Sequence, residues 1–191
     1  MRNLLSILYR PAETMRHILA QPRDRMVLPL VLLAGLSDAL RNIKIDEMRH
    51  TPLSPHIIAI VIGVCIAVLL VGLGIFYGMA WVVTMVGRLF EGQGTWRSTC
   101  SALAWGLVPV VLTLIYRIPL TFLPKPPALI AVVLLIQAAV VIWWIALTSI
   151  TVAEAHQFSP WTALGTLALS ALAPLVVVAA AALTMFLGKH H

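Results

Sequence analysis

The stretch GRLFEGQGTWRSTCSALAWGLVP, residues 87 to 109, is the place where a long apolar chain turns polar and then apolar again. The residues around it are mostly Leu, Val, Ala and Ile, whereas the stretch itself brings together charge, Gly, Thr and Trp. Trp prefers the headgroup level of a bilayer, and clusters of Gly and polar residues end apolar helices. The stretch therefore predicts an interfacial elbow between two transmembrane helices.

The composition indicates that lipid is the solvent for most of the surface. Of the 191 residues, 61% are hydrophobic and 10% are charged, a balance far from that of soluble domains. Cys65 and Cys100 have neither zinc-site nor disulfide spacing, so both are expected to be packing residues. The net charge of +6 comes from basic residues beside apolar runs, which indicates membrane orientation and anionic headgroups rather than nucleic acid. We expect an all-α integral membrane protein with no cofactor and no nucleic-acid partner.

Five apolar runs are candidates for helices that cross the hydrocarbon, which takes about 20 residues. They are residues 26–44, 56–86, 99–122, 127–153 and 161–187. The second run is long enough to imply tilt or extension beyond the membrane. The predicted fold is a polytopic five-helix membrane domain over residues 26–189, preceded by a cytoplasmic amphipathic segment over residues 1–25.

The N-terminal segment holds the densest basic cluster in the chain: Arg2, Arg10, Arg16, Arg23 and Arg25. Such a cluster places the N-terminus in the cytoplasm, and five spans then place the C-terminus outside, with Arg88 and Arg97 inside and Arg117 and Lys125 outside. The same arginines interrupt any apolar core of a cleavable signal, so the segment is expected to be retained.

Apolar residues recur at helical spacing in this segment. They predict a helix that lies on the membrane surface, broken near Pro11, with Arg2, Arg10 and Arg16 toward anionic headgroups. The alternative is a helix that packs on the protein's own cytoplasmic loops.

Residues 96–109, WRSTCSALAWGLVP, align with residues 161–174, WTALGTLALSALAP, at one constant offset. The matched positions are Trp96 with Trp161, Leu107 with Leu172, and Pro109 with Pro174. Trp suits the headgroup level, the small residues let helices approach closely, and Pro bends the helix. An internal repeat is one interpretation, and a chance match of three positions is the other.

Three stretches together resemble the Yip1 domain family in its bacterial branch: RPAETMRHILAQP, FEGQGTWRSTCSALAWGLVPVVL and AEAHQFSPWTALGTLAL. The resemblance implies a cytoplasmic N-terminal segment, five transmembrane helices, a Gly-rich elbow before the third helix and an aromatic-Gly-x-x-Pro pattern within it. Trp105, Gly106 and Pro109 match that pattern. The resemblance also implies a multi-pass protein of the bacterial inner membrane. Eukaryotic members are associated with Rab GTPases, but the acidic N-terminal motif tied to that role is not evident here.

Glu154 and His156 end the fourth predicted span, on the same predicted membrane face as Arg88 and Glu91 of the elbow. Two carboxylates and a histidine can bind a divalent metal or carry protons. These four residues are therefore the candidate polar or metal site. Their spacing matches no ligand motif, and a solvated hydrogen-bonded cluster is the alternative.

Polar residues also fall inside the apolar runs. Asp38 and Arg41 share a helix face and can pair, which with Lys44 suggests a polar pathway or headgroup site, because ionisable residues at membrane depth are functional candidates. The alternative is that the first helix ends near Leu40 and these side chains reach the interface. Gln137, in the middle of the fourth span, is expected to bond a neighbouring helix.

The sequence contains no Ser-His-Asp or Cys-His arrangement, phosphate loop or HExxH motif, so we expect no catalytic activity. A membrane-organising scaffold or adaptor fits this absence, with membrane lipids and other membrane proteins or further copies of the chain as partners. A small transporter, channel or lipid-moving protein that uses intramembrane polar residues is the alternative.

Overall fold

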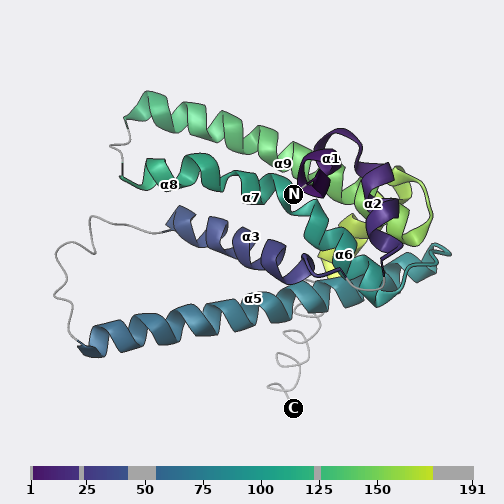
Figure 1. The fold of residues 1–191 in the computed structure, drawn as a ribbon, viewed down its shortest axis with the longest axis horizontal. Coiled ribbons are helices and arrows are strands. Elements are labelled where there is room, and N and C mark those ends of the chain that lie inside the picture. The colour runs from purple at the N-terminus through teal and green to yellow at the C-terminus, as the bar shows by residue number, and fades with distance from the viewer. Residues whose placement is uncertain (1, 22–23, 43–54, 123–125, 174–191) are drawn as a thin grey trace, which may run out of the picture.

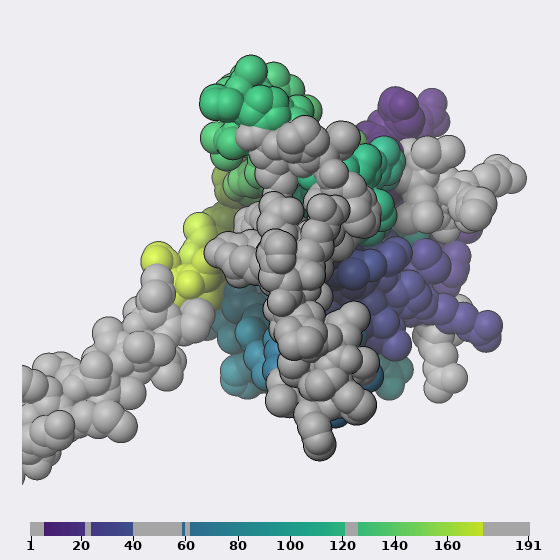
Figure 2. All heavy atoms as spheres, turned by 90° about the vertical axis from the view of Figure 1, so that its left-hand side faces the viewer, coloured from purple at the N-terminus to yellow at the C-terminus, as the bar shows by residue number. Residues whose placement is uncertain are grey.

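The computed structural model describes residues 2–21, 24–42, 55–122 and 126–173, and every regular element in that part is an α-helix (Figure 1). The labelled helices are α1 (Arg2–Tyr9), α2 (Pro11–Leu19), α3 (Val27–Asn42), α5 (Pro55–Leu89), α6 (Trp96–Gly106), α7 (Val108–Leu112), α8 (Leu114–Phe122) and α9 (Pro127–His156). A further helix covers Pro160–Ala173 and lies to one side of the molecule (Figure 2). The all-α prediction is confirmed for these residues.

Three helical stretches are long and apolar enough to cross a membrane. They are Ile62–Leu89, Trp96–Leu120 and Pro127–His156, which match the second, third and fourth predicted spans. At the first and fifth positions the described apolar helices are shorter, Val27–Ala39 and Pro160–Ala173. The remainder of the fifth predicted span, including Pro174, lies outside the described residues, so the fivefold crossing stays a prediction.

Both long outer helices have an exposed length and a packed end. On α5, Ile75 is 63% exposed whereas Ala80 and Val83 are fully buried, and on α9 Ile142 is 70% exposed whereas Val152 is fully buried. The 35 residues of α5 extend about 52 Å at 1.5 Å per residue, well beyond a hydrocarbon core of about 30 Å. The exposed apolar lengths are therefore suited to lipid, and the packed ends to the membrane surface and the water beyond it.

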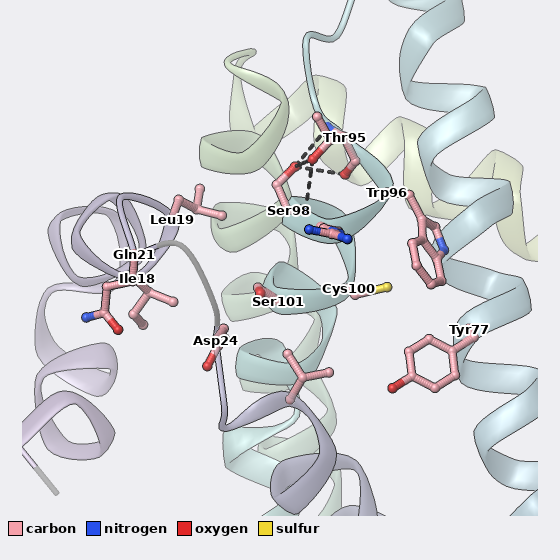
Figure 3. A pocket seen from close by; sticks show the side chains of 12 residues that line it. Ile18, Leu19, Gln21, Asp24, Tyr77, Thr95, Trp96, Ser98, Cys100 and Ser101 are labelled. Atoms are coloured by element: carbon pink, nitrogen blue, oxygen red, sulfur yellow. Dashed lines mark hydrogen bonds between the residues drawn. The ribbon is translucent and has the colours of Figure 1, made fainter.

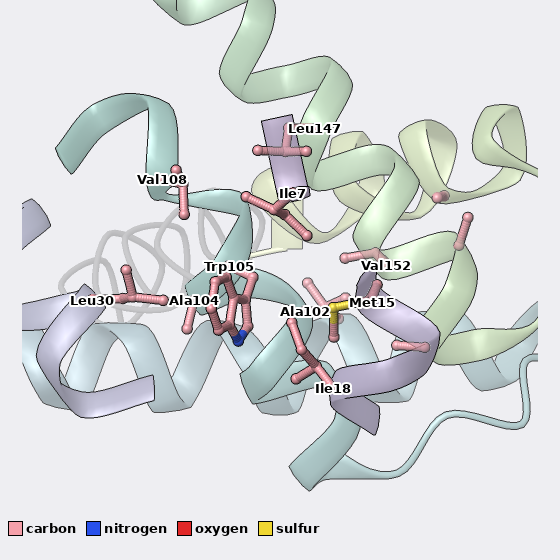
Figure 4. Close-up of a cluster of buried hydrophobic side chains, with 14 residues drawn as sticks. Ile7, Met15, Ile18, Leu30, Ala102, Ala104, Trp105, Val108, Leu147 and Val152 are labelled. Atoms are coloured by element: carbon pink, nitrogen blue, oxygen red, sulfur yellow. The ribbon is translucent and has the colours of Figure 1, made fainter. Parts of the chain in front are cut away.

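The packed ends of α5 and α9 meet α1, α2 and α6 in one hydrophobic core (Figures 1 and 4). Ile7 and Met15 are fully buried there and Ile18 is 3% exposed. The apolar face of the N-terminal segment is thus covered by protein. For these three residues α6 and α9 supply an apolar surface that satisfies the same hydrophobic pattern, as in the alternative of a helix packed on the protein itself. That the segment lies on the membrane surface stays a prediction.

Two basic residues of this segment have partners within the protein. Arg10 contacts Glu13 at 3.4 Å on the exposed side, and Arg16 pairs with Glu154 of α9. The side chain of Arg2 lies outside what the structure describes. Arg16, which was expected to face anionic lipid, therefore pairs with a carboxylate of the same chain.

The third span is interrupted at the Trp-Gly-x-x-Pro motif. Trp105 is 2% exposed, and its Nε1 donates to Asp24 Oδ2 at 2.7 Å. A Cβ on Gly106 would lie 2.5 Å from Thr148 Oγ1, so glycine lets α6 and α9 touch. Pro109 offers no N–H to the carbonyl four residues earlier, and α6 gives way to α7 at Leu107. Trp105 thus anchors the helix, Gly106 allows its close contact with α9, and Pro109 interrupts it.

Candidate functional site at the elbow

The elbow begins where α5 ends. The Gly92 N–H donates to the Gly87 carbonyl at 2.9 Å and the Glu91 N–H to the Arg88 carbonyl at 3.1 Å, a Schellman arrangement that closes the helix. Glu91 has a φ of 61°, in the left-handed region, where side chains other than Gly and Asn are disfavoured. Residues 87–92 therefore form a tight turn, and the chain reverses here as predicted.

The chain then enters α6 through a capping box. Thr95 Oγ1 accepts the Ser98 N–H at 3.2 Å, and Ser98 Oγ accepts the Thr95 N–H at 2.9 Å (Figure 3). Both bonds satisfy N–H groups that have no partner inside the helix. The start of α6, and with it the position of Trp96, is fixed by these two side chains.

His156 lies inside the elbow, 1% exposed. Its ring fills a space bounded by three glycines, because a Cβ at Gly87, Gly92 or Gly94 would come within 2.6, 2.7 and 2.6 Å of the ring. We call these three residues the glycine cradle. The imidazole also stacks on Phe158, with centroids 5.2 Å apart and planes 18° apart. Any larger residue in the cradle would displace the ring, which explains the glycine content of the elbow.

Hydrogen bonds connect this ring to two helices. His156 Nε2 lies 3.0 Å from Thr99 Oγ1 of α6, and Thr84 Oγ1 of α5 lies 3.0 Å from the same oxygen. The His156 carbonyl accepts the Gln93 N–H at 3.0 Å. Nδ1 has no hydrogen-bond partner among the described residues. The histidine thus joins the end of α9 to α5, the elbow and α6 through one buried cluster.

Glu154 faces another partner. Arg16 Nε donates to its Oε2 at 2.7 Å and Arg16 Nη2 to its Oε1 at 2.9 Å. These hydrogen bonds, followed by the carboxylate charge, raise the pKa of Arg16. Paired donors of a guanidinium match the two oxygens of a carboxylate and fix their relative orientation. The carboxylate therefore holds α2 against α9.

The four residues predicted as a polar or metal site thus have separate surroundings. His156 is buried in the glycine cradle, Glu154 bonds Arg16, and Arg88 and Glu91 are exposed at the turn, with Arg88 near enough for its charge to act on the histidine. Within the described ranges, no three His, Cys, Asp or Glu side chains are grouped so as to hold a metal ion. The described residues offer no ligand set for the metal interpretation.

A second polar cluster lies between α3, α8 and α9. The Gln137 amide oxygen accepts hydrogen bonds from Arg117 Nη2 at 2.7 Å and from the Tyr116 hydroxyl at 3.1 Å, so it does bond a neighbouring helix. Arg117 Nη1 donates to the Ser37 carbonyl at 2.5 Å, and Ser37 Oγ lies 2.5 Å from Thr113 Oγ1. Arg117, predicted near the outer end of the third span, is a residue of α8 that bridges α3 and α9.

Asp38 follows Ser37 on α3 and is exposed. The side chain of Arg41, its predicted partner, lies outside the described residues, as does all of Lys44. The polar pathway suggested for these three residues therefore stays a prediction.

Sequence patterns did not predict the hydrogen bonds made by Arg16, Thr84, Thr99 and Arg117. The threonines had a signal, since they are polar residues at helix-packing positions within or beside apolar runs. The arginines had none beyond their charge, because their partners are far away in the sequence.

The two matched segments begin in similar ways. Trp96 and Trp161 lie in the first turns of their helices and are 44% and 81% exposed. Before the second helix, Gln157 has a φ of 62° and the Phe158 N–H donates to the Ala153 carbonyl at 3.2 Å, so α9 closes as α5 does. These shared features are consistent with an internal repeat.

Comparison with known proteins identifies the family of this chain. A family model described as the Yip1 domain matches residues 5–182. Neither the search of curated proteins nor the search of solved structures gave a match. The matched range begins in α1 and contains the glycine cradle, the Trp105-Gly106 helix crossing and Pro109. The chain belongs to the Yip1 domain family, and its apolar helices are those of a membrane protein.

Proposed function

We propose that this protein is a membrane-organising scaffold or adaptor of the bacterial inner membrane, with five spans, a cytoplasmic N-terminus and no catalytic step. The observation that carries the proposal is the fastening of the N-terminal helices to the membrane helices. Arg16 and Glu154 join α2 to α9, and Ile7 and Met15 are fully buried beneath the same helices. A surface held in this way is a rigid platform on which a partner can dock at little cost in ordering.

The polar side chains of the bundle support a structural role. His156 and Thr99 bond each other across α9 and α6, and Gln137 and Arg117 bond each other across α9 and α8. A conduction or transport pathway requires polar groups that are free to exchange partners with a moving solute. In this bundle those groups connect helices instead.

The end of the molecule that contains the elbow and α1 offers a docking surface. Leu89 is 76% exposed and Phe90 is 45% exposed at the elbow, and Tyr9 is 85% exposed at the end of α1. These side chains belong to the end of the molecule where the helices pack on one another rather than to the lipid-suited lengths. Exposed apolar side chains outside the lipid are typical of protein interaction sites. The expected occupant is another membrane protein or a second copy of this chain.

Photocrosslinking in membranes tests this proposal. A photoreactive residue at Leu89 or Tyr9 is expected to give discrete protein adducts. One at Ile142, which is 70% exposed on the lipid-suited part of α9, is expected to give lipid adducts. Purified protein in liposomes should show ion and fluorescent-lipid flux at the rate of empty liposomes. Absence of protein adducts from both Leu89 and Tyr9 would contradict the scaffold.

The second candidate function is a transporter or lipid-moving protein. Arg117 favours it, because a guanidinium that bonds the middle of a lipid-exposed helix is a feature often found in ion and substrate pathways. Flux that rises with protein content and is lost in Arg117→Gln and Gln137→Leu would establish this alternative and overturn the scaffold.

A further inference from the structure

A cavity of about 430 Å³ opens between α2, the start of α3, α5 and the first turns of α6 (Figure 3). Its volume is within the range of pockets that hold small molecules, roughly 300–1,000 Å³. Asp24, Arg97 and Ser101 line its polar part, and Tyr77 and Trp96 line its apolar part. The cavity is separate from the glycine cradle, which lies on the α9 side of the elbow.

The polar part contains one charge of each sign. Arg97 is exposed and has no ion-pair partner in the described part of the chain. Asp24 is held in place, since Oδ2 accepts the Trp105 Nε1 at 2.7 Å and Oδ1 accepts the Met26 N–H at 2.9 Å. A carboxylate can accept about four hydrogen bonds, so Asp24 keeps capacity for a cationic ligand.

Ser101 adds a hydroxyl group to the polar part. It is 8% exposed and lines the cavity. A serine hydroxyl can both donate and accept a hydrogen bond. Ser101 can therefore bind a polar group of a molecule that enters the cavity.

The apolar part indicates the level of the membrane at which the cavity lies. The Tyr77 and Trp96 rings lie 5.8 Å apart between centroids, at the level where α5 changes from exposed at Ile75 to buried at Ala80. Tyr and Trp concentrate at the headgroup level of a bilayer. A cavity bordered by this pair is expected to open toward lipid headgroups rather than toward bulk water.

We propose that this cavity binds the headgroup of a phospholipid that carries both a phosphate and a primary ammonium, as phosphatidylethanolamine does. Arg97 holds the phosphate, Asp24 and Ser101 accept hydrogen bonds from the ammonium, and the glycerol region leaves past Tyr77 and Trp96. A choline headgroup lacks the N–H groups that these acceptors require, and a glycerol headgroup places no cation beside Asp24. The site goes beyond the scaffold function and does not depend on it.

Binding of short-chain lipids to the purified full-length protein in detergent tests the site. Dioctanoyl lipids with ethanolamine, choline and glycerol headgroups are compared by native mass spectrometry and by the shift in melting temperature. The ethanolamine lipid is expected to bind most tightly. Arg97→Gln should weaken that binding about tenfold, the loss expected for one charge-assisted hydrogen bond, and Ser101→Ala should weaken it less. Arg10→Gln removes an exposed arginine that does not line the cavity and should leave the binding unchanged.

Three results would overturn the site. They are equal binding of all three headgroups, preference for the glycerol headgroup, and unchanged binding in both Arg97→Gln and Ser101→Ala. Deacylated glycerophosphoethanolamine serves as the soluble probe. If it binds as tightly as the dioctanoyl lipid, the ligand is a soluble phosphate ester and the lipid assignment is wrong. Asp24→Asn keeps an acceptor for Trp105, and its circular dichroism spectrum separates loss of binding from loss of fold.

Discussion

The Arg16 guanidinium of α2 and the Glu154 carboxylate of α9 meet in two parallel hydrogen bonds of 2.7 and 2.9 Å, although 138 positions separate them in the sequence. The arginine side chain is 70% exposed and the carboxylate 19% exposed. An ion pair at the surface contributes little to global stability, but its fork geometry fixes orientation. Its main effect is therefore to fix where α1 and α2 dock.

Arg16→Ala is expected to loosen the N-terminal helices while leaving the membrane helices folded. The measurement is the rate of limited chymotrypsin cleavage after Tyr9, which should rise severalfold with little change in melting temperature. Arg16→Lys should be intermediate, since an ammonium cannot make both bonds of the fork. Arg10→Ala is the matched control, because Arg10 contacts only Glu13 of the same segment. Cleavage at the wild-type rate in Arg16→Ala would contradict the role of the pair.

Local patterns predicted the elements but not what covers them. The lengths of the apolar runs indicated the long helices, and the cluster of Gly, Thr and Trp after Gly87 indicated the elbow. The helical spacing of apolar residues in the N-terminal segment predicted an apolar face, and Met15 and Ile18 of that face are buried. It could not show whether lipid or protein covers that face, because both are apolar and select the same residues. Here α6 and α9 cover it.

The partners of the site could not be predicted from spacing. Helical periodicity relates residues three or four positions apart, whereas the His156 ring meets Gly87, Gly92 and Gly94 from the far end of α9. Pro119 was expected near the end of the third predicted span, yet it lies inside α8. Prolines are tolerated in membrane helices when neighbours satisfy the freed backbone groups, and only the packed structure shows those neighbours.

The glycine cradle predicts a rescue experiment. Gly94→Ala places a Cβ 2.6 Å from the His156 ring, and overpacking of this kind costs ~1–3 kcal/mol. The melting temperature should fall clearly, and His156→Ala introduced into the Gly94→Ala protein should restore part of it, because the obstructing ring is then absent. Gly78→Ala is the control, since no atom lies within 4 Å of its added Cβ. Strictly additive effects of Gly94→Ala and His156→Ala would contradict direct contact.

At the crossing of α6 and α9, a substitution of glycine is expected to be rescued less fully than in the glycine cradle. A Cβ on Gly106 would lie 2.5 Å from Thr148 Oγ1 and also 3.1 Å from Thr148 Cα. Gly106→Ala is therefore expected to lower the melting temperature. Thr148→Ala should rescue it only in part, because the backbone of α9 remains in the way. Gly165→Ala, with open space around the added Cβ, should have little effect. Full rescue by Thr148→Ala would show that the two backbones can separate at no cost.

Substitutions of Arg117 and Gln137, which bond each other, are expected to lower the melting temperature by different amounts. Arg117→Leu leaves the Gln137 amide oxygen with only the Tyr116 hydroxyl and removes the bond to the Ser37 carbonyl. Gln137→Leu leaves Arg117 bonded to Ser37. An unsatisfied polar group away from water costs ~1–3 kcal/mol, so Arg117→Leu should lower the melting temperature more than Gln137→Leu does.

The double variant Arg117→Leu with Gln137→Leu completes the cycle. It removes both members of the 2.7 Å bond, so neither is left without its partner. The decrease in its melting temperature should therefore be smaller than the sum of the decreases in the two single variants. Tyr116→Phe is the conservative control, since it removes one hydroxyl from the same amide oxygen and keeps the ring. Additive losses would mean that Arg117 and Gln137 stabilise the bundle independently, and that the bond between α8 and α9 contributes nothing of its own.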